Sequence, residues 1–117
     1  MAHEDLPFSG VRVFDLSQGV AGPYCGMHFA RNGADVVKLE PPGTGCWSRQ
    51  LGKAIGDQTA HSVVVHRGKR SLAVDLKTPE GLEIAKRLAA ECNSEPALRV
   101  LRSKTRCWVP LMLSPIR

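Results

Sequence analysis

The chain has 117 residues, enough for one domain, and its 43% hydrophobic content is ordinary for a globular protein. Its formal charge of +5 is uneven: residues 1–92 hold eleven Lys and Arg against ten Asp and Glu, whereas residues 93–117 hold five against one. A nucleic-acid-binding protein normally spreads basic residues over a folded face, so we expect no nucleic-acid partner.

The sequence also shows no membrane span, no signal peptide and no metal-binding motif. No apolar stretch approaches the roughly 18 residues that a membrane span needs, and residues 1–10 lack the basic and then apolar order of a signal peptide. We therefore expect a cytoplasmic protein with no membrane partner. The four cysteines form no C-x-x-C pair and the four histidines are not spaced as ligands, so we expect no metal.

The first elements in chain order form a strand–helix–strand unit. Residues 11–16 (VRVFDL) are apolar on both faces, as in a buried parallel strand. Pro23 suits the first position of a helix, and Asn32-Gly33 is a typical helix stop. Residues 34–40 (ADVVKLE) form a second strand, ended by two prolines. This order predicts a βαβ unit with a right-handed crossover.

The middle of the chain is less regular. Residues 41–61 carry four glycines and two prolines without periodicity, which predicts a long loop. A short apolar run (62–65) follows, and then a strand over residues 71–76 (SLAVDL) with alternate apolar side chains on one face. Thr78 caps a helix that has Pro79 at its first position. The apolar stripe of this helix comprises Leu82, Ala85, Leu88, Ala89 and Cys92.

The pattern changes after Asn93. The rest of the chain is basic and has no sustained period, and Pro110 argues against a central strand there. We therefore expect an α/β fold with an incomplete Rossmann-like βαβ unit and parallel strands, followed by an irregular C-terminal tail. The predicted division is a Rossmann-like part over 1–93 and a divergent basic tail over 94–117. Two helices cannot cover both faces of such a sheet, so we expect a marginal or aggregation-prone domain unless a partner or the tail covers its exposed edge.

Two local patterns allow more than one interpretation. The turn after the first strand reads Gly19-x-x-Gly22-x-x-x-Gly26, which departs from the dinucleotide fingerprint G-x-G-x-x-G, although Glu40 lies where a ribose-binding acid belongs. These glycines can equally serve a tight turn. The basic residues of the stretch HRGKRSLAVDLKTPEG allow two readings, a solvated turn or a face toward phosphates. They are Arg67, Lys69 and Arg70.

Several blocks in order resemble one family. The stretch LPFSGVRVFDLSQGVAGPYCGMHFARNGADVVKLEPPGTG contains L-x-G-x-x-V-x-D-L, A-G-P-x-C and G-A-D-V-V-K-L-E, and RGKRSLAVDLKTPEG follows it. These blocks resemble the opening of the class III CoA-transferases, a group that includes formyl-CoA transferase and α-methylacyl-CoA racemase. The resemblance runs from about Leu6 to Asn93.

The resemblance implies a transferase that moves CoA between carboxylic acids through an aspartyl-CoA intermediate, with acyl-CoA or CoA as ligand. Carried over residue by residue, the first CoA contact falls on the backbone of Val20 and Ala21. The second falls on Val74, Asp75, Leu76 and Lys77. In some members an arginine makes a further contact at the position of Pro41, so that ionic contact is missing here. The residues themselves allow a simpler role for three of these: Val74 and Leu76 as core, and Asp75 as a tie to a neighbouring loop.

The resemblance also has a limit. Family members run to several hundred residues and form interlocked homodimers, and their nucleophilic aspartate lies beyond the matched blocks. The aspartates of this chain match other positions, so none of Asp15, Asp35, Asp57 and Asp75 is the nucleophile. We therefore expect a family fragment, truncated before the catalytic residue, inactive alone and doubtful as a dimer. The alternatives are a stand-alone CoA- or nucleotide-binding module, an NAD-binding Rossmann fragment, or a fragment of the racemase branch.

Overall fold

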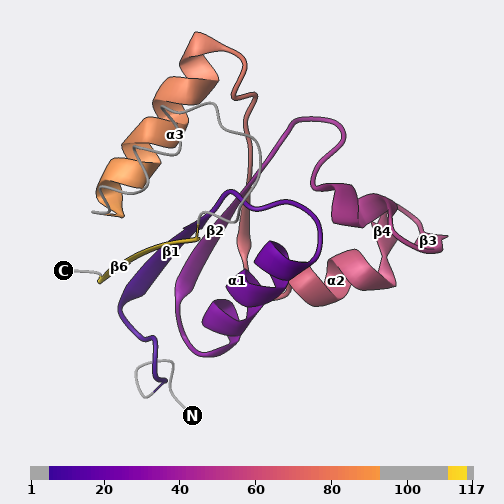
Figure 1. Cartoon of the computed structure of the whole chain (residues 1–117), viewed down its shortest axis with the longest axis horizontal. Helices are drawn as coiled ribbons and strands as arrows, with labels where there is room; N and C mark the ends of the chain where they lie inside the picture. Colours follow the sequence, from indigo (N-terminus) through magenta and orange to yellow (C-terminus); the bar gives the residue numbers. More distant parts are fainter. Residues whose placement is uncertain (1–5, 93–110, 116–117) are drawn as a thin grey trace.

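The computed structural model describes residues 6–92 and the backbone of residues 111–115 (Figure 1). Its elements in chain order are β1 (Val11–Asp15), α1 (Ala21–Arg31), β2 (Asp35–Glu40), the 3-10 helix η2 (Trp47–Gln50), β3 (Ala54–Ile55), β4 (Gln58–Thr59), α2 (Ala60–His66), β5 (Arg70–Ala73), α3 (Pro79–Glu91) and β6 (Leu111–Pro115). Within this part of the chain, no helix is long and apolar enough to span a bilayer.

The main sheet has the strand order β5-β2-β1-β6. β1 pairs with β2 and β2 with β5 in parallel, and β6 is an antiparallel edge strand beside β1. The order β5-β2-β1 is that of one half of a Rossmann sheet, in which each crossover carries a helix. The predicted α/β class with a parallel βαβ unit is confirmed.

The edge strand differs from the expectation for the tail. Residues 111–115 are not irregular: Leu111 pairs with Asp15 and Pro115 with Val11. Pro110 lies outside the described residues, and the strand itself ends in Pro115, which an edge position tolerates because one side of an edge strand needs no ladder partner. Part of the tail therefore covers the free edge of β1, whereas residues 93–110 and 116–117 lie outside the described residues. The division into domains at residue 93 stays a prediction.

Two other predicted elements have different bounds. α1 begins at Ala21, two residues before Pro23, and β5 ends at Ala73 instead of Leu76. The backbone N–H of Val74 still donates to the Glu40 carbonyl, at 2.9 Å. The Asp75 side chain then accepts the Lys77 amide at 2.9 Å, which turns the chain toward α3 and ends the strand.

The predicted loop over 41–61 holds regular structure. It contains η2 and the short β3–β4 hairpin, and the apolar run 62–65 lies inside α2. A capping box starts this helix, because the Thr59 side chain accepts the Ser62 amide while the Ser62 hydroxyl accepts the Thr59 amide. α2 has seven residues, too few for its periodicity to be recognised in the sequence.

Each face of the sheet has its own apolar cluster. On the α1 face, Val13 and Val36 pack with Ala30 and Ala34. On the α3 face, the cluster comprises Phe14, Val37, Leu39, Val74, Ala85, Ala89 and Cys92. The alternation along β1 and β2 therefore supplies both faces, as a parallel sheet between helices requires.

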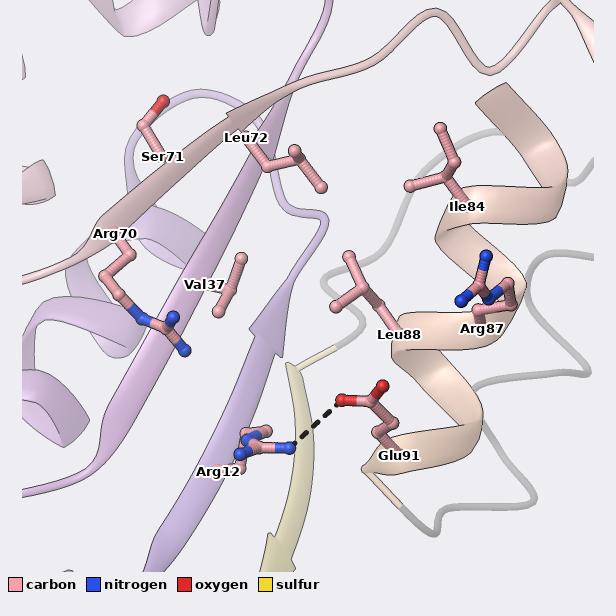
Figure 2. A pocket seen from close by; sticks show the side chains of 9 residues that line it. All are labelled: Arg12, Val37, Arg70, Ser71, Leu72, Ile84, Arg87, Leu88 and Glu91. Carbon is pink, nitrogen blue, oxygen red and sulfur yellow. Dashed lines mark hydrogen bonds and ion pairs between the residues drawn. The ribbon is translucent and has the colours of Figure 1, made fainter. Parts of the chain in front are cut away.

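The α3 face is only partly covered. A hollow of about 570 Å³ lies between α3 and the strands. Figure 2 shows Leu72, Val37 and Leu88 in it, with the Arg12 guanidinium bonded to Glu91 of α3 at 3.2 Å. Its lining residues are Arg12, Val37, Arg70, Ser71, Leu72, Ile84, Arg87, Leu88 and Glu91. Val20, Ala21 and residues 74–77, which the resemblance assigns to CoA, are not among them; Arg70, whose role the sequence left open, is.

The α3 cap gives a test of this architecture. The Thr78 hydroxyl oxygen accepts the Gly81 amide at 3.1 Å, and Thr78→Ala leaves that amide without its acceptor. We expect the free energy of unfolding to fall by about 1 kcal/mol, measured by urea denaturation. The control is Thr44→Ala, because Thr44 is exposed and lies outside any helix. Equal stability of the two variants would contradict the capping role.

Candidate functional site

The carboxyl ends of the parallel strands lie at one edge of the sheet. Because β1, β2 and β5 run in the same direction, the β1–α1 turn and the β5–α3 turn both leave from this edge (Figure 1). Ligands of open α/β sheets bind outside the carboxyl ends of the strands. The two predicted groups of contact residues, Val20 with Ala21 and residues 74–77, are therefore on the same side of the molecule.

The β1–α1 turn depends on Gly19. Its φ is +85°, and a Cβ placed there would lie 2.3 Å from the indole ring of Trp47. The Gly19 amide donates to Cys46 Sγ at 3.3 Å, and the Trp47 amide donates to the Gln18 side-chain oxygen at 3.3 Å. The segment that opens η2 thus packs directly on the turn, and the glycine permits that contact.

The start of α1 is open. Val20 is its N-cap residue and Ala21 its first helical residue, and both are exposed. No side chain caps the helix, and its first turn holds no acidic residue. The first amides of a helix have no acceptor within the helix, so those of this turn are free for an external acceptor. Pro23 has no amide to offer.

The start of α3 is closed by its own residues. The Asp75 carbonyl accepts the Thr78 hydroxyl at 2.9 Å, and a Cβ on Gly81 would lie 2.0 Å from that carbonyl oxygen. The Asp75 carboxylate binds its own turn, so it does not tie the strand to a neighbouring loop. Glu80 adds a negative charge to the first turn.

The remaining predicted contacts divide between core and surface. Val74 is buried in the α3-face cluster, which confirms its core role. Leu76 is 39% exposed, so its alternative role as core is wrong: the strand ends before it. Lys77 is exposed, and its ammonium group makes no hydrogen bond or ion pair with the residues that the structure describes.

Beneath the β1–α1 turn lies a buried charged trio: Asp15, Lys38 and Lys69. The Asp15 carboxylate accepts Lys69 Nζ at 2.8 Å and lies 3.4 Å from Lys38 Nζ. It also accepts the Ser17 amide at 2.9 Å and the Ser17 hydroxyl. Gly26 of α1 leaves room for the trio, because a Cβ there would lie 2.8 Å from an Asp15 oxygen.

The two lysines also bind the turn itself. Lys38 Nζ donates to the Ser17 carbonyl, and Lys69 Nζ donates to the Pro23 carbonyl at 2.7 Å. The exposed fraction is 1% for each lysine side chain and zero for Asp15. The trio therefore links β1, β2 and the start of β5 to the β1–α1 turn and to α1.

This arrangement corrects the interpretation of the basic turn. Lys69 is neither solvated nor directed at a surface phosphate, since its side chain is buried against Asp15. Arg70 is exposed, and its guanidinium makes two bonds to Asp35, with Nε at 2.8 Å from Oδ1. Arg67 is exposed, as a solvated turn requires. The three basic residues thus have three different roles.

Two members of the trio, Asp15 and Lys69, have shifted pKa values. Burial raises the pKa of Asp15, but the charges of Lys38 and Lys69 outweigh it, so the net shift is downward and the carboxylate stays ionised. Burial lowers the pKa of Lys69, and attraction to Asp15 only partly offsets that effect. With both lysines protonated, one carboxylate faces two ammonium groups.

Glu40 forms a second buried pair. Its carboxylate accepts two bonds from Arg49, Nε to Oε2 and Nη2 to Oε1, each of 2.8 Å, and the Cys46 amide donates to Oε2 at 2.9 Å. The hydrogen bonds from Arg49 lower the pKa of Glu40 to about 2, against the effect of burial. Because these donors occupy both oxygens of a buried side chain, Glu40 is not a ribose ligand. The NAD-binding alternative loses its main residue.

A third contact joins η2 to α2. Ser48 Oγ and His66 Nε2 are 2.9 Å apart, and His66 Nδ1 is buried with no hydrogen-bond partner among the described residues. Burial lowers the pKa of His66 to about 4, and the nearby Lys69 ammonium adds to this shift. His66 is therefore neutral at pH 7.

The sequence interpretation gave no role to Lys38, Arg49 or His66. One signal for Lys38 was present: on β2, Val37 and Leu39 face one side, whereas Lys38 and Glu40 continue the side of Val36. Because both faces of this strand are buried, charged side chains on one of them need buried groups of opposite charge or hydrogen-bond partners. Within the described residues, no three His, Cys, Asp or Glu side chains are placed to hold a metal ion.

Comparisons with known proteins point to one family. The family model described as CoA-transferase family III matches residues 8–93. Human succinyl-CoA:glutarate CoA-transferase is 40% identical over 88 residues, which cover 74% of this chain and 20% of that protein. Succinyl-CoA–D-citramalate CoA-transferase of Chloroflexus aurantiacus is 43% identical over 83 residues, covering 70% of this chain and 21% of that protein.

A solved structure supports the same relationship. A CAIB/BAIF family protein from Brucella suis superposes with a TM-score of 0.69 and 29% sequence identity. The match covers 82% of this chain and 31% of that one. The chain spans about a fifth of the length of the two curated relatives.

The Ser48–His66 contact predicts a pH dependence of stability. The folded pKa of His66 is about 4 against an ordinary value of 6.5, so the unfolded chain binds more protons between these values. The free energy of unfolding should therefore fall as the pH drops from about 6.5 to about 4. Its slope against pH should approach the value for one extra proton bound by the unfolded chain.

Urea denaturation of His66→Gln across this range tests the effect. Glutamine keeps a hydrogen-bonding side chain beside Ser48 but does not titrate, so this variant should lose the part of the slope that His66 contributes. His28→Gln is the control, since His28 is exposed on α1. A slope that is the same in His66→Gln and in the unchanged chain would show that His66 is not the titrating group.

Proposed function

The chain belongs to CoA-transferase family III, and we propose that it provides the CoA-binding portion of an enzyme that moves CoA between carboxylic acids. The observation that carries this proposal is the pairing of two features at one sheet edge. One is the open N-terminus of α1, and the other is the free ammonium group of Lys77. Both belong to the residues that the family resemblance assigns to CoA.

In the proposed complex, CoA lies along the carboxyl edge from α1 to the β5–α3 turn. The backbone amides at Val20 and Ala21 donate to polar or anionic groups of the ligand, as helix N-termini commonly do. Lys77 supplies a point charge for a phosphate. Val74 contributes through its backbone because its side chain is in the core, and Leu76 offers an exposed apolar contact.

Asp75 has a different place in this proposal. Its side-chain oxygen Oδ1 accepts the Lys77 amide, so Asp75 shapes the turn that presents Lys77. Any contact of Asp75 with CoA is made by its other exposed atoms. Proline at position 41 leaves no cation at that point of the edge. Among the described residues that the resemblance assigns to CoA, Lys77 is therefore the one cation.

We also propose that the carboxylate of the aspartyl-CoA intermediate lies outside the described residues. Asp15 is fully buried between two lysines, Asp35 is paired with Arg12 and Arg70, and Asp75 caps its own turn. A nucleophilic carboxylate has to reach the acyl carbon of a bound thioester. The described residues then bind and orient CoA, and we expect no transfer by them alone.

Isothermal titration of CoA into the full chain tests the proposal. We expect saturable binding that Lys77→Ala weakens about fivefold, the effect of losing roughly 1 kcal/mol from one exposed charge-assisted contact. Lys53→Ala is the matched control, because Lys53 is exposed and lies in the loop before β3.

Two outcomes would contradict this proposal. The first is no saturable CoA binding by the unchanged chain. The second is saturable binding of NADH that Glu40→Gln abolishes, which would favour the dinucleotide-binding alternative.

A further inference from the structure

The buried cations Lys38 and Lys69 do more than pair with Asp15, since each also holds a carbonyl of the β1–α1 turn. We infer that they are positioning residues, which fix the turn and place positive charge beneath it, and so set its affinity for the anionic part of CoA. This inference rests on the proposed function.

The geometry gives the first reason. Lys38 binds the carbonyl of Ser17 at the start of the turn, and Lys69 binds that of Pro23 in the first turn of α1. In a trans peptide the C=O and the following N–H point in opposite directions. When the Ser17 carbonyl is drawn inward, the Gln18 amide is directed away from the lysines, and the segment between the two anchored carbonyls is fixed at both ends.

Charge gives the second reason. One Asp15 carboxylate faces two ammonium groups, and the side chains of all three are buried. The other charged groups of this region do not neutralise the excess: Glu40 is paired with Arg49, and His66 is neutral at pH 7. With both lysines protonated, a net positive charge therefore lies under the start of α1.

Such a charge is costly in the free protein. Removing an ammonium group from water is unfavourable, and the attraction of Asp15 is shared between two lysines. Carbonyl oxygens of Ser17 and Pro23 offset part of this cost. An anion bound at the open end of α1 offsets more of it, and the positive end of the helix dipole acts in the same direction. Anion binding and protonation of the trio should therefore favour each other.

Burial also makes these lysines different from Lys77. Salt screens the attraction between exposed charges, whereas charges in a low-dielectric interior are screened much less. The contribution of Lys77 to CoA binding should fall as salt rises. The contribution of Lys38 and Lys69 should persist.

Titration of CoA into the full chain tests the inference with Lys38→Met and Lys69→Met, at about 0.05 M and about 0.5 M salt. Methionine nearly matches the lysine stem, and each single variant leaves Asp15 with one cation. We expect each variant to lose about tenfold or more in affinity at both salt concentrations, whereas the loss caused by Lys77→Ala shrinks at high salt.

Arg70→Met is the control. It also removes one positive charge and one ion pair, with Asp35, but it has no contact with the turn, so the affinity should not change. Circular dichroism and thermal melting establish that each variant is folded. Folded Lys38→Met and Lys69→Met chains that bind CoA as the unchanged chain does would overturn the inference and leave the proposed function intact. No binding by the unchanged chain would overturn both.

A measurement on the unchanged protein covers variants that do not fold. Nitrogen-15 spectra of the lysine Nζ atoms, recorded over pH with and without CoA, report the protonation of each ammonium group. We expect CoA to raise the pKa of Lys69, because the bound anion stabilises the charged form. Unchanged titration of Lys69 in the presence of saturating CoA would overturn the inference.

Discussion

The carboxylate of Asp15 is the point on which the arrangement of this domain depends. It ends β1, and its partners come from β2, from the residue before β5 and from the β1–α1 turn. Through Lys69 the same network reaches the first turn of α1. Elsewhere on the α1 face, apolar side chains pack between the sheet and the helix. At the carboxyl end of the strands, charged groups make this contact instead. A buried charge needs its partners in defined places, which makes this end more specific in geometry than an apolar contact would be.

A second set of polar contacts organises the segment between β2 and α2. Glu40 holds η2 through Arg49 and the Cys46 amide, and Ser48 contacts His66 on α2. This segment then lies against Gly19, so the position of the β1–α1 turn is fixed from above by Trp47 and from below by the lysines. The order of this segment comes from ion pairs and hydrogen bonds, which leave no hydrophobic period in its sequence.

These interactions explain which features could be predicted from the sequence. β1, α1, β2 and α3 were predictable because alternation, a helix stop and a Thr-Pro cap are local signals. The role of Lys69 was not, since its partner Asp15 lies 54 positions away. The strand over 71–76 was predicted too long because Leu76 continued the apolar alternation, while Asp75 forms a turn there. The pairing of residues 111–115 with β1 depends on an edge about 100 positions earlier, and no local pattern of the tail reveals it.

The two helix starts at the carboxyl edge differ in how far their own residues satisfy the first backbone amides. Both α1 and α3 direct the positive end of a helix dipole toward this edge. α3 satisfies its own amides with Thr78 and adds Glu80, so its positive end is already compensated. α1 has neither device, and the trio beneath it adds charge of the same sign as its dipole. In the proposed complex an anionic ligand at this edge therefore gains most at α1, and the β5–α3 turn contributes through the exposed Lys77. The asymmetry lies in the sequence: a capping threonine and an acid start one helix, whereas Val20, Ala21 and Gly22 start the other.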